Sequence, residues 1–141
     1  MATIHVDIVS AEREIFAGEA QAVFAPLVLG EIGILPRHTP LLGRLKPGEV
    51  RVQVSADEQH QFYVTGGLLE VQPNIVTVLA DTAVRARDLD EALAQAAVTR
   101  AEEALVDRGD NFDHARAQAA LVEAMERLRI ARKYRTAGGH R

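Results

Sequence analysis

The sequence predicts an all-β sandwich followed by an α-helical antiparallel hairpin, which divides the 141 residues into two small domains, residues 1–86 and 87–141. Up to about Val84, apolar residues recur with period two, as along residues 4–8 and 50–54, a pattern typical of half-buried strands. From Asp88 until Gly109 the chain has no glycine or proline, and alanine, leucine and charged residues replace the β-branched ones. This composition favours a helix. A break at residues 109–111 precedes a second helical pattern.

The first domain shows several short strands separated by turn signals, a spacing typical of a sandwich or a barrel. Besides residues 4–8 and 50–54, the expected strands are residues 20–24, 27–29, 61–65, 68–72 and 75–79. Pairs such as Pro47-Gly48 and Gly66-Gly67 mark turns between them. The stretch from Ile75 to Leu79 is apolar except at Thr77, which predicts a strand in the middle of a sheet.

The two predicted helices are rich in alanine. We expect Asp88 to cap the first helix, with Glu91 reaching back as in a capping box. The expected facing stripes are Ala92, Ala96, Ala97, Ala101 and Ala104 on the first helix and Ala117, Ala120, Ala124 and Ala131 on the second. Alanine buries little apolar area, so parting such a seam costs roughly a few kcal/mol. The hairpin is therefore either a detachable arm or, if the alanines serve only helix propensity, a rigid spacer.

Composition excludes several classes of protein. The chain has 16 basic and 20 acidic residues, a net charge of −4, which disfavours a nucleic-acid partner. It has no cysteine, which excludes thiolate metal sites and thiol redox chemistry. Its apolar runs are far shorter than the roughly 20 residues that cross a bilayer. Residues 1–10 show no signal-peptide pattern, so we expect a soluble chain.

The charge is distributed unevenly along the chain. Residues 1–84 carry 5 basic and 10 acidic residues, whereas residues 85–141 carry 11 basic and 10 acidic residues. The end of the second helix is strongly basic, through Arg127, Arg129, Arg132, Lys133 and Arg135. These cations either compensate the negative end of the helix dipole or form an arm that docks on an acidic surface.

Residues that could support catalysis are scattered. The five histidines show no ligand spacing, so no metal site is expected. His5 and His60 fall on the polar sides of strands and are expected to be solvated, which leaves His38, in a Pro-Arg-His-Thr-Pro loop, as a candidate contact residue. Residues 30–33, Gly-Glu-Ile-Gly, precede no helix and are expected to form a turn rather than a phosphate loop. The pattern favours an interaction module. The alternatives are a small β-sandwich enzyme and a nucleic-acid-binding module that uses the basic helix.

Three segments resemble the epsilon subunit of bacterial F-type ATP synthase. They are Gly-Glu-Ile-Gly-Ile-Leu-Pro-Arg-His-Thr-Pro-Leu at residues 30–41, Gly-Gly-Leu-Leu-Glu-Val at 66–71 and Val-Thr-Val-Leu-Ala-Asp-Thr-Ala at 76–83. The resemblance extends over essentially the whole chain. It implies a non-catalytic central-stalk subunit of a proton-translocating ATP synthase, held at the cytoplasmic face of the bacterial membrane only through the complex.

The resemblance also implies partners for each domain. Residues 1–86 would contact the gamma subunit and the c ring, with His38 on the gamma side. The residues on the c-ring side would be Gly30, Glu31, Ile32 and Gly33. The hairpin of residues 87–141 would be a mobile regulatory arm that extends into the alpha/beta catalytic head and inhibits ATP hydrolysis. We expect the basic residues from Arg127 to Arg135 to dock there on an acidic surface.

Some members of the family bind ATP on the hairpin through an Ile/Leu-Asp-x-x-Arg-Ala motif. The matching stretch here is Leu-Asp-Glu-Ala-Leu-Ala at residues 89–94, so Leu93 stands where the motif has arginine. Leucine cannot pair with a phosphate or donate hydrogen bonds to it. We therefore expect no cofactor, and no ATP site on this hairpin.

Overall fold

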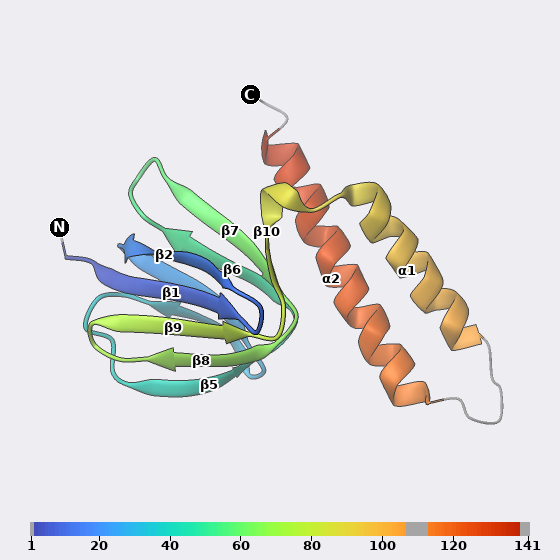
Figure 1. Ribbon diagram of the computed structural model, residues 1–141, viewed down its shortest axis with the longest axis horizontal. Helices are drawn as coiled ribbons and strands as arrows, with labels where there is room; N and C mark the ends of the chain where they lie inside the picture. Colours follow the sequence, from blue (N-terminus) through green and yellow to red (C-terminus); the bar gives the residue numbers. More distant parts are fainter. Residues whose placement is uncertain (1, 107–112, 139–141) are drawn as a thin grey trace. The chain divides into compact units, whose positions relative to one another are not determined.

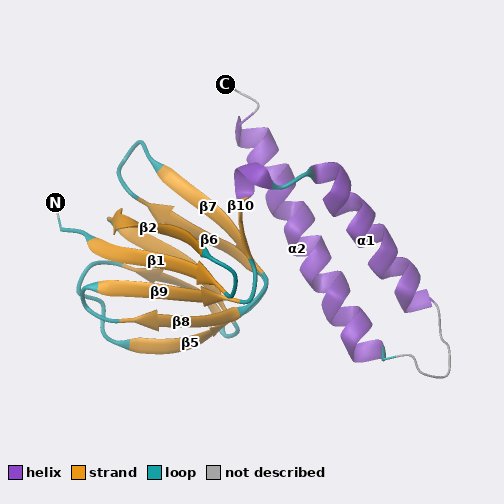
Figure 2. Cartoon of the chain, viewed as in Figure 1, coloured by secondary structure: helices purple, strands orange, loops and turns teal. Residues whose placement is uncertain are grey.

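A computed structural model of the protein describes residues 2–106 and 113–138, and the chain divides into two compact units, Met1–Arg85 and Ala86–Arg141. The first unit consists of strands and the second of helices (Figures 1 and 2). The strands are β1 (Ile4–Ser10), β2 (Glu14–Ala20), β3 (Ala22–Leu27), β4 (Gly30–Ile34), β5 (Leu41–Leu45), β6 (Gly48–Gln53), β7 (Gln59–Val64), β8 (Gly67–Val71), β9 (Ile75–Ala80) and β10 (Ala83–Arg85). The helices are the short 3-10 helix η1 (Ala86–Asp88), α1 (Glu91–Val106) and α2 (His114–Gly138). The predicted fold class is confirmed.

The strands form one sheet that folds into a sandwich, in the order β10-β7-β6-β3-β5-β8-β9-β1-β2, with β4 paired to β3. The pairing of β1 with β9 is parallel, and the other pairings are antiparallel. Strand β9 lies between β8 and β1, which confirms the central position predicted for this apolar stretch.

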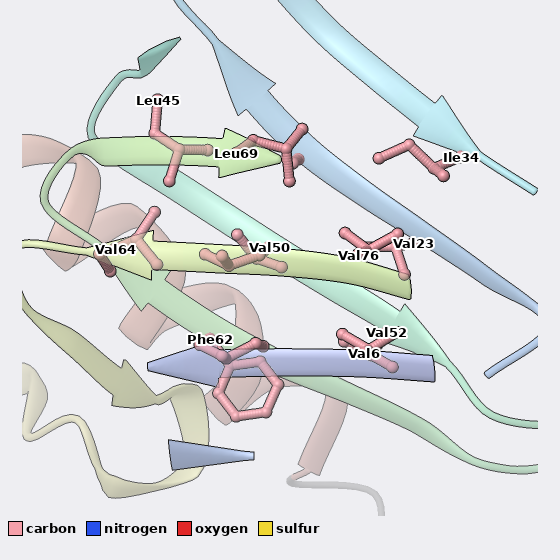
Figure 3. Packing of buried hydrophobic residues seen from close by; sticks show 14 of the residues in the cluster. Val6, Val23, Ile34, Leu45, Val50, Val52, Phe62, Val64, Leu69 and Val76 are labelled. Carbon is pink, nitrogen blue, oxygen red and sulfur yellow. The ribbon is translucent and has the colours of Figure 1, made fainter. Parts of the chain in front are cut away.

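The core of the first unit is formed by the inward-facing side chains of alternating strand residues. Along β1, for example, Ile4, Val6 and Ile8 are fully buried, because successive side chains point to opposite faces of a strand. Side chains from the other strands meet them, as Figure 3 shows for Phe62, Leu69, Val76, Val50 and others. The period-two pattern in the sequence therefore marks the core directly.

Arg85 ties together the two strands at the ends of the sheet order, β10 and β2. Its Nη2 atom donates a hydrogen bond to the carbonyl oxygen of Ile15 at 3.1 Å. The guanidinium carbon lies 5.2 Å from the ring centroid of Phe62, which in turn contacts the ring of Phe16 edge-on at 5.7 Å. An aromatic seam and a cation thus hold the open edges of the sandwich together.

The turn predicted at residues 30–33 is wrong. These residues begin strand β4, which pairs with β3 from Leu27 opposite Gly30 to Val23 opposite Ile34. The turn falls two residues earlier, at Val28 and Leu29. Strands β2, β5 and β10 were not anticipated either. β5 and β10 pair with strands that are distant in the sequence, whereas β2 forms a hairpin with β1 and was missed because its own apolar pattern is weak.

Gly67 explains the Gly-Gly-Leu-Leu-Glu-Val motif. Its φ angle is 128°, in a region that favours glycine, and a Cβ atom there would clash with the carbonyl oxygen of Leu79. At the start of this motif, the backbone of β8 therefore lies too close to that of β9 for any side chain.

The helix cap predicted at Asp88 is wrong. Asp88 ends η1, and α1 begins at Glu91 with Asp90 as its N-cap. The Asp90 Oδ1 atom accepts hydrogen bonds from the backbone amides of Ala92 at 2.9 Å and Leu93 at 3.2 Å. Asp90 therefore satisfies two of the amides that a helix start leaves without partners.

The seam between α1 and α2 differs from the predicted alanine stripes. Ala94, Val98 and Leu128 form its buried centre, with Leu121 and Ala124 packed against them. Of the predicted stripe residues, Ala92, Ala96, Ala104 and Ala120 are exposed. Alanine occurs on several sides of α1, so composition alone did not fix which face packs. The seam still contains few large apolar side chains, so parting it costs roughly a few kcal/mol.

Candidate functional site

The hairpin between β3 and β4 carries a protruding apolar tip. Its side chains belong to Val28, which is 55% exposed, and Leu29, which is 100% exposed. Gly30 begins β4 with a φ of 133°, a region that favours glycine, and the amide of Val28 donates to the carbonyl of Arg44 at 2.9 Å. The strand predicted over residues 27–29 is wrong here: β3 ends at Leu27, and Val28 and Leu29 form the turn before β4.

Next to this tip, Glu31 is held in place by a side chain from β6, the strand on the other side of β3. The Nη2 atom of Arg51 on β6 lies 3.2 Å from the Glu31 Oε1 atom, and the Arg51 guanidinium lies 4.7 Å from the ring centroid of Phe24 on β3. On the adjacent strand, a Cβ atom at Gly33 would lie 3.1 Å from the Phe24 ring. The ring of Phe24 is thus packed between a glycine and a cation, and it supports the arginine that orients Glu31.

His38 lies in the loop that follows the other end of β4. The His38 ring Nδ1 lies 2.7 Å from the carbonyl oxygen of Thr39, to which it donates as an N–H. The neighbouring Arg37 has a φ of 65°, and its amide donates to the carbonyl of Pro73 at 3.0 Å. Gly30 and Glu31 lie at the start of β4, and His38 follows its end. Because strand residues advance about 3.3 Å each, the length of β4 separates the two predicted contact sites.

Three exposed leucines lie on the outer face of the sheet, and we call them the leucine face: Leu42, Leu68 and Leu79. They are 68%, 43% and 46% exposed. Leu68 on β8 pairs with Leu79 on β9. On β5, Arg44 pairs with Leu68, and Leu42 lies two residues before Arg44, so its side chain is on the same face of the sheet. Sequence reasoning did not assemble this face, because its members come from three strands.

His5 and His60 are partly exposed to solvent, as expected for the polar sides of strands, and each also contacts a carboxylate. The His5 ring lies between two carboxylates, with Nδ1 2.9 Å from Glu19 and Nε2 3.0 Å from Asp7. These hydrogen bonds, with that to Glu19 the larger effect, raise the pKa of His5 above its ordinary value of 6.5. The His60 ring lies 2.7 Å from Glu58 and contacts Phe16 at 5.2 Å between centroids.

The basic residues predicted near the end of α2 do not share one environment. Arg127 is half-buried, and Arg129 forms a bidentate contact with Glu126, the shorter distance being 2.8 Å. Arg132 and Lys133 are exposed, and the side chain of Arg135 lies outside the described residues. At 100° per residue, Arg129, Arg132 and Lys133 fall within an arc of about 100°, and we call them the basic face.

Within the residues that the structure describes, no group of three or more His, Cys, Asp and Glu side chains could hold a metal ion. The described helices include none long and apolar enough to cross a membrane. In the stretch that matches the ATP motif, Leu93 is 64% exposed and the carboxylate of Asp90 caps α1.

The fold and these surfaces define a class of protein: an interaction subunit in which a β-sandwich with exposed contact surfaces is joined to a helical hairpin. Residues 3–86 match the family described as "ATP synthase, Delta/Epsilon chain, beta-sandwich domain", and residues 87–132 match "ATP synthase, Delta/Epsilon chain, long alpha-helix domain". The chain therefore belongs to the ATP synthase delta/epsilon family. The resemblance to an epsilon subunit is confirmed.

Curated relatives support the same assignment. The chain is 62% identical over 133 residues to the ATP synthase epsilon chain of Nitrosococcus oceani, covering 94% of this chain and 95% of the relative. It is 63% identical over 134 residues to the epsilon chain of Thioalkalivibrio sulfidiphilus, with the same coverage of 94% and 95%. The chain is thus a non-catalytic subunit of an ATP synthase complex, and this assignment replaces the enzyme and nucleic-acid alternatives.

Two solved structures share the fold. A chain in the Euglena gracilis mitochondrial ATP synthase, in a structure of OSCP, F1 and the c-ring, superposes with a TM-score of 0.79 at 20% identity, covering 89% of this chain and 79% of that one. A chain in the central stalk and c-ring of the Tetrahymena thermophila enzyme gives a TM-score of 0.58 at 15% identity, covering 92% and 94%.

Proposed function

We propose that this subunit joins the gamma subunit to the c ring in the central stalk, and that its hairpin is a mobile arm that inhibits ATP hydrolysis. The complex holds it at the cytoplasmic face of the bacterial membrane. The observation that supports the stalk contact most strongly is the leucine face, because exposed apolar side chains gathered on one face of a rigid sheet mark a protein-binding surface. The fold neighbours described above come from ATP synthase assemblies with a c-ring.

The β3–β4 hairpin fits the proposed c-ring contact. Leu29 offers an apolar side chain that can be desolvated completely, and Glu31 offers a carboxylate whose direction is fixed by Arg51. Such a combination of an apolar anchor and an oriented charge gives both affinity and register in an interface. Ile32, which pairs with Ala25, and the fully buried Ile34 anchor the hairpin in the sandwich.

The leucine face fits the proposed gamma contact. Transmission of torque requires a surface that does not deform, and a sheet with closely packed side chains beneath it meets this requirement. The His38 loop is itself fixed, by the bond from His38 to Thr39 and by the bond from Arg37 to Pro73. We assign His38 to the gamma side as well.

Co-purification tests the gamma contact. The full chain is expected to bind purified gamma, and Leu68→Asp combined with Leu79→Asp is expected to weaken this binding at least about tenfold, because two carboxylates would be buried at the interface. The control is Leu93→Asp on α1, which changes an exposed leucine in the other unit, 64% exposed against 43% for Leu68 and 46% for Leu79. Equal binding by the doubly substituted chain and the control would refute the assignment of this face to gamma.

ATP hydrolysis by the assembled enzyme tests the inhibitory role. Removal of residues 88–141, or the triple change Arg129→Gln, Arg132→Gln and Lys133→Gln, is expected to raise the hydrolysis rate. The triple variant keeps the full length of the chain and replaces three cations by neutral side chains, so its effect should shrink as salt is added, since salt screens exposed charges. An unchanged rate in both variants would overturn the inhibitory role.

A further inference from the structure

We propose that Arg132 clamps the hairpin closed, and that this clamp competes with docking of the basic face for the same side chain. The proposal rests on the inhibitory function proposed above and adds the means by which the hairpin itself restrains it. The restraint would be intramolecular, since the groups that form it all belong to this chain.

The clamp is a forked contact between the two helices. The Arg132 Nε atom on α2 donates to Glu91 Oε1 at 3.2 Å, and its Nη2 atom donates to Gln95 Oε1 at 2.8 Å. Glu91 and Gln95 are four residues apart on α1, so they lie one above the other on the same helix face. One planar guanidinium can therefore engage both side chains at once.

The clamp lies where the hairpin is most easily parted. α1 ends at Val106 and α2 begins at His114, so the chain connects the helices at the opposite end. Arg132 is one turn beyond Leu128, the last residue of the seam centre, and Glu91 is one turn before Ala94. The contact thus closes the open end of a seam that contains few large apolar side chains.

Docking and clamping require the same donors. Arg132 belongs to the basic face with Arg129 and Lys133, and its side chain is 53% exposed. While its Nε and Nη2 atoms donate to α1, they cannot meet carboxylates on an acidic partner in the same geometry. Arg129 contacts Glu126 on its own helix. At Arg132, hairpin closure and docking require the same donor atoms and therefore exclude each other.

The competition predicts opposite effects from the two sides of one ion pair. Glu91→Gln removes the charge that holds Arg132 and leaves the arginine in place, so docking should increase and the assembled enzyme should hydrolyse ATP more slowly. Arg132→Gln removes both the clamp and the docking charge, so hydrolysis should not slow down. An exposed ion pair of this kind changes the ratio of docked to undocked arms by about two- to five-fold.

The experiment uses the assembled ATP synthase with full-length variants of this chain. The matched control is Glu103→Gln, which removes one negative charge from an exposed position of α1 away from the clamp. Amide hydrogen exchange in the full chain provides a second readout: Glu91→Gln should speed exchange around residues 94–98 and 124–131 about two- to five-fold, and the control should not.

The outcomes separate the two proposals. Slower hydrolysis with Glu91→Gln, but not with Arg132→Gln or the control, supports the clamp. Unchanged or faster hydrolysis with Glu91→Gln, in an enzyme that the triple variant of the basic face does activate, overturns the competition and leaves the inhibitory function standing. If neither the triple variant nor removal of residues 88–141 changes the hydrolysis rate, the inhibitory function fails, and hydrogen exchange that Glu91→Gln leaves unchanged then overturns the clamp as well.

Discussion

The backbone of Gly33 lies against the ring of Phe24, so closely that a Cβ atom there would stand 3.1 Å from Cε1 and 3.3 Å from Cδ1. On the strand that pairs with the other edge of β3, the Arg51 guanidinium lies 4.7 Å from the centroid of the same ring and also contacts Glu31. The second glycine of the Gly-Glu-Ile-Gly segment is therefore a packing requirement, which keeps the ring, the arginine and the carboxylate in position.

This contact predicts a specific stability loss. Gly33→Ala should lower the free energy of unfolding by about 1–3 kcal/mol, because the added methyl group overpacks against the ring. The same substitution in a Phe24→Leu background should cost less, since the smaller side chain can move away. Urea denaturation of the four chains measures the difference, and an identical cost in both backgrounds would contradict the steric explanation.

Gly30 provides the comparison, because it is a glycine for a different reason. Nothing lies within 4 Å of a Cβ atom at Gly30, but its φ is 133°. Gly30→Ala should therefore lower the free energy of unfolding by about 1–3 kcal/mol through backbone strain. This cost should be the same with phenylalanine or leucine at position 24.

The stability of the first unit should depend on pH through His5. The pKa of His5 is raised above 6.5 by hydrogen bonds to Glu19 and Asp7, and the same contact with His5, followed by that with Thr3, lowers the pKa of Glu19 below 4.5. The raised pKa of His5 stabilises the fold below pH 6.5 and this contribution disappears as the pH rises through the folded-state pKa. The lowered pKa of Glu19 stabilises the fold above pH 4.5 and this contribution disappears as the pH falls.

The two effects together favour the interval between about pH 4.5 and pH 6.5. The difference in urea midpoint between the natural chain and His5→Gln should be largest there and smaller at pH 8. The control is His60→Gln, because His60 lies on β7 and pairs with Glu58 instead of with Asp7 or Glu19. A midpoint difference that does not change with pH would rule out this contribution of His5.

Arg85 should matter for closure of the sheet. Arg85→Ala removes the hydrogen bond to Ile15 and the contact with Phe62, and we expect a loss of about 1–3 kcal/mol in the free energy of unfolding, with faster hydrogen exchange in β2. Arg87→Ala, an exposed arginine two residues later, should change stability by less than about 0.5 kcal/mol. Equal losses from the two substitutions would show that the contact between β10 and β2 does not depend on Arg85.

The start of α1 should depend on Asp90 and not on Asp88. Asp90→Ala leaves the amides of Ala92 and Leu93 without their side-chain acceptor and should lower helix stability by about 1 kcal/mol. Asp88→Ala should have a much smaller effect. Hydrogen exchange at residues 91–95 of each variant measures the difference, and a larger effect of Asp88→Ala would reverse the assignment of the cap.

Local patterns predicted those parts of the molecule that depend on neighbours in the sequence. The alternation along β1, the apolar run of β9 and the alanine-rich segments after Asp88 identified the two units and their order, because burial of one face imposes a period on a strand or a helix. The placement of the cap failed by two residues, since both Asp88 and Asp90 are chemically able to cap and only the backbone path through η1 selects between them.

The proposed contact surfaces could be predicted only in part. Residues 30–33 and His38 were identified through resemblance, but the sequence did not reveal that Arg51 and Phe24, on two other strands, determine how the Glu31 carboxylate is held. The leucine face was missed because Leu42, Leu68 and Leu79 meet only through strand pairing. Strand register decides which outward-facing residues become neighbours, and register is a long-range property.

The sequence by itself determined the family, the order of a β unit before an α hairpin, and the residues able to be buried, because each of these follows from local periodicity and from motifs that are contiguous in the chain. Tertiary structure alone decided which charges meet: Arg51 with Glu31, His5 with Glu19, and Arg132 with Glu91. Ion pairs need side chains within about 4 Å, and only the folded backbone brings residues 14 to 41 positions apart to that distance.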